Sequence, residues 1–259
     1  MVLLLAGVVA VLPFRGHAMP RYDSFILVMD ALVFLCSLFI AVRLCAEHFT
    51  EGRVSVLVLA CGYFFSALII IPHALTFPGV FAEQGLLGAG RQTTAWLYLI
   101  WHVSLPPTVL AYTLLKGTRF DEPGRLGAPA RSVAAAIALA VLVALALTWL
   151  VTSGERLLPG LMVDEVRRTR AWTDLAAVPV LAMSLAAIVI VWLCRTSTLD
   201  LWLLVVLWAW FIETLLLGLT ADRFSAVWYV GRVIGALSSG VLLIPLAIRA
   251  SAKSSAERG

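Results

Sequence analysis

Five ionisable side chains lie inside apolar stretches of the sequence, where a charge is costly. They are Asp30, His73, His102, Glu213 and Arg232. Ionisable residues within membrane-spanning segments are rare and mark ligand, ion or proton sites. A carboxylate and a guanidinium can form a strong hydrogen-bonded pair, whereas an imidazole can exchange a proton or bind a metal. These five residues are therefore the first candidates for a site inside the bilayer.

The five residues lie at a similar depth in their stretches. Each is about three to nine residues from the outer end of its stretch, which at about 1.5 Å per residue is the outer half of a bilayer. Polar groups at one depth on five helices predict one shared ligand-binding cavity in the outer half of a bundle.

The composition of the chain indicates that these stretches are membrane helices. Of the 259 residues, 62% are hydrophobic and 13% are charged, about half the charged fraction of a typical soluble domain. This excludes a soluble enzyme, a nucleic-acid-binding module and a disordered chain. The apolar runs are residues 1–14, 24–46, 54–76, 93–116, 132–151, 174–194, 199–219 and 225–248. We therefore predict an all-α, polytopic integral membrane bundle with about eight transmembrane helices, the first of them short for a full span.

Glu213 and Arg232 are expected to form a pair across a helical hairpin. Each lies about nine or ten residues from the turn near Asp222 and Arg223, which predicts equal height on adjacent helices. A direct or water-mediated contact would neutralise both charges. Such a pair is either a structural ion pair or a ligand-sensitive one.

Aromatic residues accompany the polar ones. Tyr98 precedes His102 by one turn, and Trp101 is its neighbour. Trp208 and Trp210 precede Glu213 on the same run. We expect these four aromatic residues to form the walls of a site for a small, partly apolar ligand, although ordinary helix packing explains them equally well.

Catalytic and cofactor motifs are lacking in the sequence. No nucleophile–base–acid spacing is present, and the last run has no lysine for a retinal Schiff base before Lys253. We therefore expect no enzyme activity and no cofactor. Haem or a metal ion held by His73 and His102 is the alternative, and so is a small transporter.

The connectors predict the orientation of the bundle. The side that holds residues 117–131 and the C-terminal tail has ten basic residues, and the other side has eight. By the positive-inside rule this places the tail in the cytoplasm.

A known family shares several of these motifs. The segment at 62–116 contains PHALTFPG (72–79), GLLGAG (85–90), QTTAWLY (92–98), Trp101-His102 and LAYTLLK (110–116). The segment 223–239, RFSAVWYVGRVIGALSS, is similar to the family's last helix. In these features the sequence resembles the MASE family of bacterial membrane-associated sensor domains, specifically its fourth type, over nearly the whole chain.

The resemblance implies an integral-membrane sensor in the bacterial cytoplasmic membrane, with the C-terminus inside. Such domains usually precede a GGDEF diguanylate cyclase or a histidine kinase, so the implied partners are the bilayer, a small-molecule ligand and a cytoplasmic output domain or separate signalling partner. A homodimer is compatible with this interpretation, and a nucleic-acid partner is not. We expect the sensor domain at residues 1–250 and a short polar cytoplasmic tail at 251–259, with no output domain in this sequence.

Overall fold

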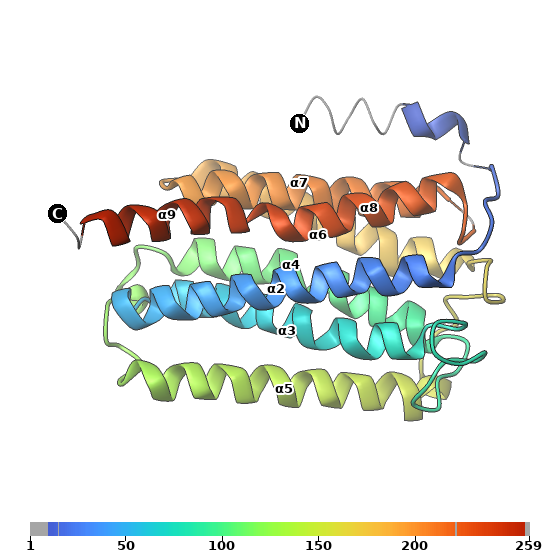
Figure 1. Cartoon of the computed structure of the whole chain (residues 1–259), viewed down its shortest axis with the longest axis horizontal. Helices are drawn as coiled ribbons and strands as arrows, with labels where there is room; N and C mark the ends of the chain where they lie inside the picture. Colours follow the sequence, from blue (N-terminus) through green and yellow to red (C-terminus); the bar gives the residue numbers. More distant parts are fainter. Residues whose placement is uncertain (1–9, 15, 221, 257–259) are drawn as a thin grey trace.

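The computed structural model describes residues 10–14, 16–220 and 222–256 as a bundle of long helices that lie side by side (Figure 1). The long helices are α2 (Asp23–Glu51), α3 (Val54–Thr76), α4 (Thr93–Leu115), α5 (Pro129–Ser153), α6 (Val178–Cys194), α7 (Thr198–Leu219), α8 (Ala226–Val241) and α9 (Leu243–Ala256). Short turns η1 (Leu12–Phe14), η2 (Arg119–Asp121), η3 (Glu155–Leu157) and η4 (Trp172–Ala177) accompany them. The described ranges hold isolated β-bridges and no strand element, so the predicted all-α class is confirmed.

Seven segments are long and apolar enough to cross a membrane, close to the expected eight. The run at 1–14 lies mostly outside the described residues. The runs at 24–46, 54–76, 93–116, 132–151 and 199–219 match α2, α3, α4, α5 and α7 to within a few residues. The chain is thus an integral membrane helix bundle.

The packing order places α8 beside α2 and α7. Helix α3 packs between α2, α4 and α5, while α6 packs on α4 and α7. Helix α5 is at the edge of the bundle (Figure 1), and most of its residues are exposed. A hydrophobic exterior of this kind is expected of helices in contact with lipid.

The fifth of the seven candidate spans, Trp172–Cys194, begins with a π-helical turn. The turn η4 precedes α6, and the N–H of Val178 bonds to the carbonyl of Thr173, five residues earlier. Pro179 follows and cannot donate a hydrogen bond, so the ordinary helical pattern is already interrupted at this point. Turns of this type are frequent at functional sites.

The predicted run at 225–248 is not one uninterrupted helix. It is divided at Leu242 into α8 and α9. Pro245 explains the division, because its ring clashes with the carbonyl four residues earlier, that of Val241, and it has no N–H. Helix α9 then continues to Ala256, so the segment expected to be a tail begins within a helix.

The two ends of the bundle differ. At one end, which we call the α9 end, α9 extends furthest from the bundle (Figure 1). The other end, which we call the loop end, holds the connectors 77–92, 154–171 and 220–225.

Candidate functional site

The proline pair of α4 creates the first feature of the site. Pro106 has no N–H to bond to the carbonyl of His102, four residues earlier. The indole N–H of Trp210 on α7 donates to that carbonyl instead, at 3.0 Å. The Trp210 ring also stacks on the His102 imidazole, with centroids 4.6 Å apart. The proline thus ties α4 to α7 at the histidine.

The protonation of His102 follows from its contacts. Its Nδ1 lies 2.9 Å from the carbonyl of Tyr98, which can only accept, so Nδ1 bears the proton. Its Nε2 lies 3.3 Å from Oε1 of Glu213, without the alignment of a hydrogen bond. A bare Nε2 would face a carboxylate oxygen, and two acceptors repel each other. One proton must therefore reside on Nε2 or on the carboxyl group.

Tyr98 lies at the centre of the polar cluster. Its ring stacks on His102 at 3.7 Å between centroids, and its hydroxyl donates to Glu213 at 3.4 Å. The guanidinium carbon of Arg232 lies 4.3 Å from the ring centroid, and the Trp172 ring is 5.6 Å away. We call Tyr98, His102, Trp172, Glu213 and Arg232 the Tyr98 site.

Within the described ranges, Glu213 and Arg232 do not form a direct ion pair, and the water-mediated contact that the sequence also allowed stays a prediction. Among the described residues, Oε2 of Glu213 and Nε of Arg232 are buried and lack hydrogen-bond partners. The glutamate lies beside Gly235 instead, where an added methyl group would overlap its carboxylate. The backbone carbonyl of Glu213 lies 3.9 Å from where a Cβ at Gly231 would stand, so the two helices meet close to the height that the equal spacing predicts.

Asp30 and His73 form a pair next to this site. Nδ1 of His73 on α3 lies 2.7 Å from Oδ2 of Asp30 on α2, and both side chains are buried. The His73 ring lies 6.4 Å from the Tyr98 ring and 6.5 Å from the Trp101 ring. The pair adjoins the Tyr98 site and joins α2 to α3.

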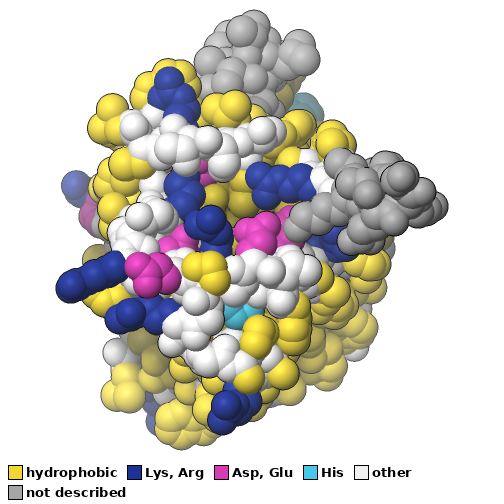
Figure 2. Space-filling view, turned by 90° about the vertical axis from the view of Figure 1, so that its left-hand side faces the viewer, with side chains coloured by type: hydrophobic (Ala, Val, Ile, Leu, Met, Phe, Trp, Pro, Cys, Tyr) yellow, Lys and Arg dark blue, Asp and Glu magenta, His cyan; other side chains and the backbone are white. Residues whose placement is uncertain are grey.

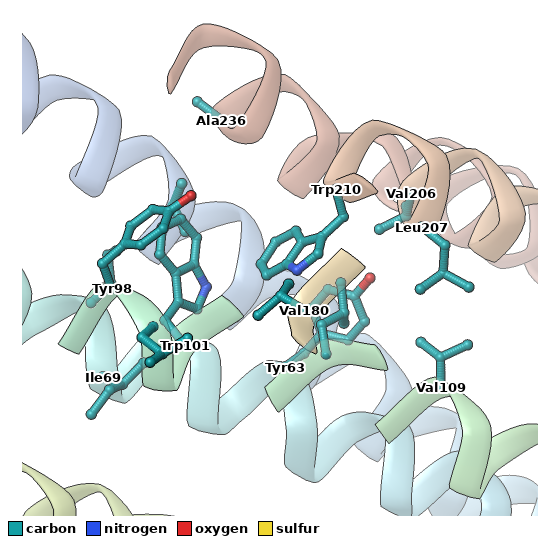
Figure 3. Close-up of a cluster of buried hydrophobic side chains, with 14 of the residues drawn as sticks. Tyr63, Ile69, Tyr98, Trp101, Val109, Val180, Val206, Leu207, Trp210 and Ala236 are labelled. Atoms are coloured by element: carbon teal, nitrogen blue, oxygen red, sulfur yellow. The ribbon is translucent and has the colours of Figure 1, made fainter. Parts of the chain in front are cut away.

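Trp101 and Trp210 are walls of the site, and Trp208 is not. Figure 3 shows Tyr98, Trp101 and Trp210 in one buried cluster. The two indole rings meet edge to face, 5.4 Å apart. Trp208 is only partly buried and contacts Phe211 on its own helix. The structure does not bring Trp208 to the Tyr98 site, because it lies two residues before Trp210 and therefore on a different face of α7.

Sequence analysis missed residues from the loop end. The Arg168 guanidinium lies 4.6 Å from the Trp172 ring and donates to the backbone carbonyls of Leu217 and Thr220. Arg223 is buried over the Phe77 ring. Burial lowers the pKa of Arg168 to about 10, and burial with neighbouring arginines lowers that of Arg223 to about 9. Both remain cationic at neutral pH.

The predicted ligand-sized cavity is closed. A void of about 10 Å³ borders Tyr98, His102 and Trp172, on the side of η4. This is close to the smallest space that holds one water molecule. The aromatic rings fill the volume between the helices, so polar groups converge without an open cavity.

The metal alternative remains an untested prediction. Within the described ranges, no group of three His, Cys, Asp or Glu side chains could hold a metal ion. His73 already uses Nδ1 to contact Asp30.

A larger pocket of about 620 Å³ lies at the α9 end. Figure 2 shows acidic and basic side chains together on this end face. Lys116 pairs with Asp200 at 2.5 Å, and Arg249 of α9 lies 3.7 Å from Glu47 of α2. This α9-end pocket is lined by Glu47, Glu51, Arg53, Ser55, Tyr112, Lys116, Ser197 and Arg249, among others.

The helix bundle and its buried polar cluster define an integral membrane helical domain. Residues 20–249 match the family MASE4, described as a membrane-associated sensor, integral membrane domain. The chain belongs to this family. No curated protein and no solved structure matches the chain.

Proposed function

We propose that this membrane sensory module receives its signal at the Tyr98 site, from a small ligand in the half of the bundle nearer the loop end. The observation that supports this proposal is the convergence of buried, unpartnered polar atoms there. His102, Glu213, Arg232 and Trp172 each contribute one. Such groups cost free energy unless a partner satisfies them in another state of the protein.

The closed void makes the site suitable for a two-state response. A ligand that enters must separate Trp172 from Tyr98 and His102. The π-helical turn that positions Trp172 offers a way to do so, because a change to ordinary α-helical pairing rotates the residues before it. A ligand that binds only the open form shifts the equilibrium towards it.

Helix α8 is the element that transmits the change. It holds Arg232 and Gly235 at the Tyr98 site and continues into α9, which contacts α2 through the Arg249–Glu47 pair. A displacement of α8 would therefore alter the α9-end pocket. From there the signal passes to a cytoplasmic output domain or a separate signalling partner, with residues 1–250 as the sensor and the C-terminus inside the bacterial cytoplasmic membrane. The module itself is not an enzyme.

A reporter fusion tests the input site. A diguanylate cyclase domain attached after Gly259 should change its basal activity in the variants His102→Ala and Glu213→Ala at equal membrane abundance. Glu83→Ala, which removes an exposed carboxylate at the loop end, is the matched control and should leave activity unchanged. Unaltered output in both site variants would contradict the proposal.

A native cysteine allows a test of transmission. An added Cβ at Gly240 of α8 would lie 3.4 Å from Sγ of Cys36 on α2, which is close to disulfide geometry. In Gly240→Cys, oxidation should lock α8 on α2 and abolish the effect of Glu213→Ala on the reporter, and reduction should restore it. The double variant Cys36→Ser/Gly240→Cys controls for the substitution. If the locked protein responds as the reduced one does, α8 does not transmit the signal.

A further inference from the structure

The polar atoms at the Tyr98 site that lack partners are mostly hydrogen-bond donors. Among the described residues at this site and next to it, the buried side-chain N–H groups without partners are Nε of Arg232, Nε of Arg168 and the indole nitrogens of Trp172 and Trp228. The corresponding acceptor is Oε2 of Glu213, and Nε2 of His102 serves either role with its proton. A ligand that satisfies this set must bring acceptor atoms.

Ring contacts connect the residues that carry these donors. The Arg232 guanidinium lies over both the Tyr98 ring and the Trp228 ring, at 4.3 and 5.5 Å from their centroids. The Arg168 guanidinium covers the Trp172 ring, which itself lies 5.6 Å from Tyr98. The Tyr98, Trp172 and Trp228 rings thus each have a guanidinium group beside them.

The charge balance of the region is positive. Three guanidinium groups, those of Arg168, Arg223 and Arg232, accompany two deep carboxylates, that of Glu213 and that of Asp30, which contacts His73. Burial first, and then the positive charge of Arg232 among others, lowers the pKa of both Arg168 and Arg223. At the rim, Arg21 pairs with Asp23 at 2.6 Å and with Glu165 at 3.1 Å, so those carboxylates are already neutralised.

We propose that the Tyr98 site binds a small aromatic carboxylate, with its anionic group at Arg232 and Arg168 and its ring between Tyr98 and Trp172. Guanidinium groups bind carboxylates through charge-assisted, often bidentate hydrogen bonds. Stacked aromatic walls favour a flat apolar body over a hydrated inorganic ion. This inference rests on the proposed sensory function and specifies the chemical class of its ligand.

The size of the void determines how such a ligand enters. A space of about 10 Å³ excludes a benzene ring, so binding requires Trp172 to move with η4. Because Trp172 and Trp228 would sense both the movement and the bound anion, tryptophan fluorescence is a direct measure of occupancy. The nine tryptophans of the chain make the variant Trp172→Phe necessary to assign the signal.

The experiment is a titration of the full chain in lipid nanodiscs with benzoate. We expect a saturable change in tryptophan fluorescence that is largely lost in Trp172→Phe. Benzamide has the same shape without the charge and should bind at least about tenfold more weakly, and benzylamine should not bind. Inorganic phosphate tests whether charge alone suffices, and a response equal to that of benzoate would overturn the aromatic part of the proposal.

Variants at both ends of the α8–α9 segment locate the site. Arg232→Gln should weaken benzoate binding about tenfold or more, while Arg249→Gln at the α9 end should leave it unchanged. Should Arg232→Gln fail to fold, Arg168→Gln, on a connector outside the spans, replaces it with the same expectation. Equal affinity for benzoate and benzamide, or no loss in either site variant, would overturn the proposal.

The two proposals can fail separately. If benzoate produces no saturable signal while Glu213→Ala still alters the reporter, the ligand class is wrong and the sensory function stands. If benzoate binds as expected but neither Glu213→Ala nor His102→Ala alters the reporter, the site binds an anion without a role in signalling.

Discussion

Nε2 of His102 lies 3.3 Å from Oε1 of Glu213 in a region with almost no solvent access, and the two atoms need one shared proton. The backbone carbonyl of Tyr98 fixes the other imidazole nitrogen as a donor. The contact between His102 on α4 and Glu213 on α7 therefore depends on where a single proton resides. A change that moves this proton should alter the packing of the two helices.

Glu213→Gln should be tolerated, whereas Glu213→Ala should not. With its NH2 group in the place of Oε1, the amide can donate to Nε2 of His102 and to the oxygen of the Tyr98 hydroxyl, which then accepts. The alanine leaves both groups unpaired and should cost about 2 kcal/mol of the free energy of unfolding. Thermal unfolding in detergent checks this expectation, and equal stability of the two variants would contradict the shared proton.

Gly235 determines the position of Glu213 on the opposite helix. A methyl group at this position would overlap the carboxylate, which is the mobile end of its side chain and can swing away. Gly235→Ala should therefore keep the fold but displace Glu213 from His102, with a changed reporter output. Gly231→Ala is the control, because its methyl group would meet the Leu217 side chain at 3.3 Å and the Glu213 backbone at 3.9 Å, without touching the Glu213 carboxylate. Identical reporter output in the two variants would argue against this placement of Glu213.

Most of the bundle could be predicted from the sequence because hydrophobic length determines membrane spans. The polar residues could also be placed at a common depth, since depth depends only on counting along a helix. The contact between His102 and Trp210 was within reach as well: Pro106 frees the His102 carbonyl, and a buried carbonyl needs a donor nearby.

The parts that could not be predicted depend on side-chain packing and on the connectors. The Glu213 carboxylate lies beside Gly235 instead of pairing with Arg232, and no periodicity specifies the direction of a side chain. Arg168 and Trp172 enter the site because the connector before α6 folds back onto α7 and because η4 replaces an ordinary helical turn. The sequence signal for η4 was Pro179. A proline shows that the helical hydrogen-bond pattern is interrupted, but it does not show which kind of turn precedes it.

The Asp30–His73 pair should stabilise the contact between α2 and α3. Asp30→Ala leaves the Nδ1–H of His73 buried without an acceptor and should cost about 3 kcal/mol, while Asp30→Asn retains an acceptor and should cost about 1 kcal/mol. Asp23→Ala removes a carboxylate that is one-third exposed and should cost less than about 1 kcal/mol. Chemical denaturation in mixed micelles measures the free energy of unfolding of the three variants. If Asp23→Ala lost as much stability as Asp30→Ala, burial of the Asp30–His73 pair would not be the cause of the loss.

Trp210 and Pro106 should be coupled through the His102 carbonyl. Trp210→Phe keeps an aromatic ring on the imidazole but removes the N–H, which should cost about 1 kcal/mol of stability. Pro106→Ala provides an N–H on α4 itself, so the double variant Trp210→Phe/Pro106→Ala should be less destabilised than the sum of the two single variants.

Trp208→Phe, on the same helix as Trp210 but away from His102, is the control for loss of an indole and should not be rescued by Pro106→Ala. A double-mutant cycle from thermal unfolding measures the coupling, and strict additivity would mean that the His102 carbonyl does not link the two residues.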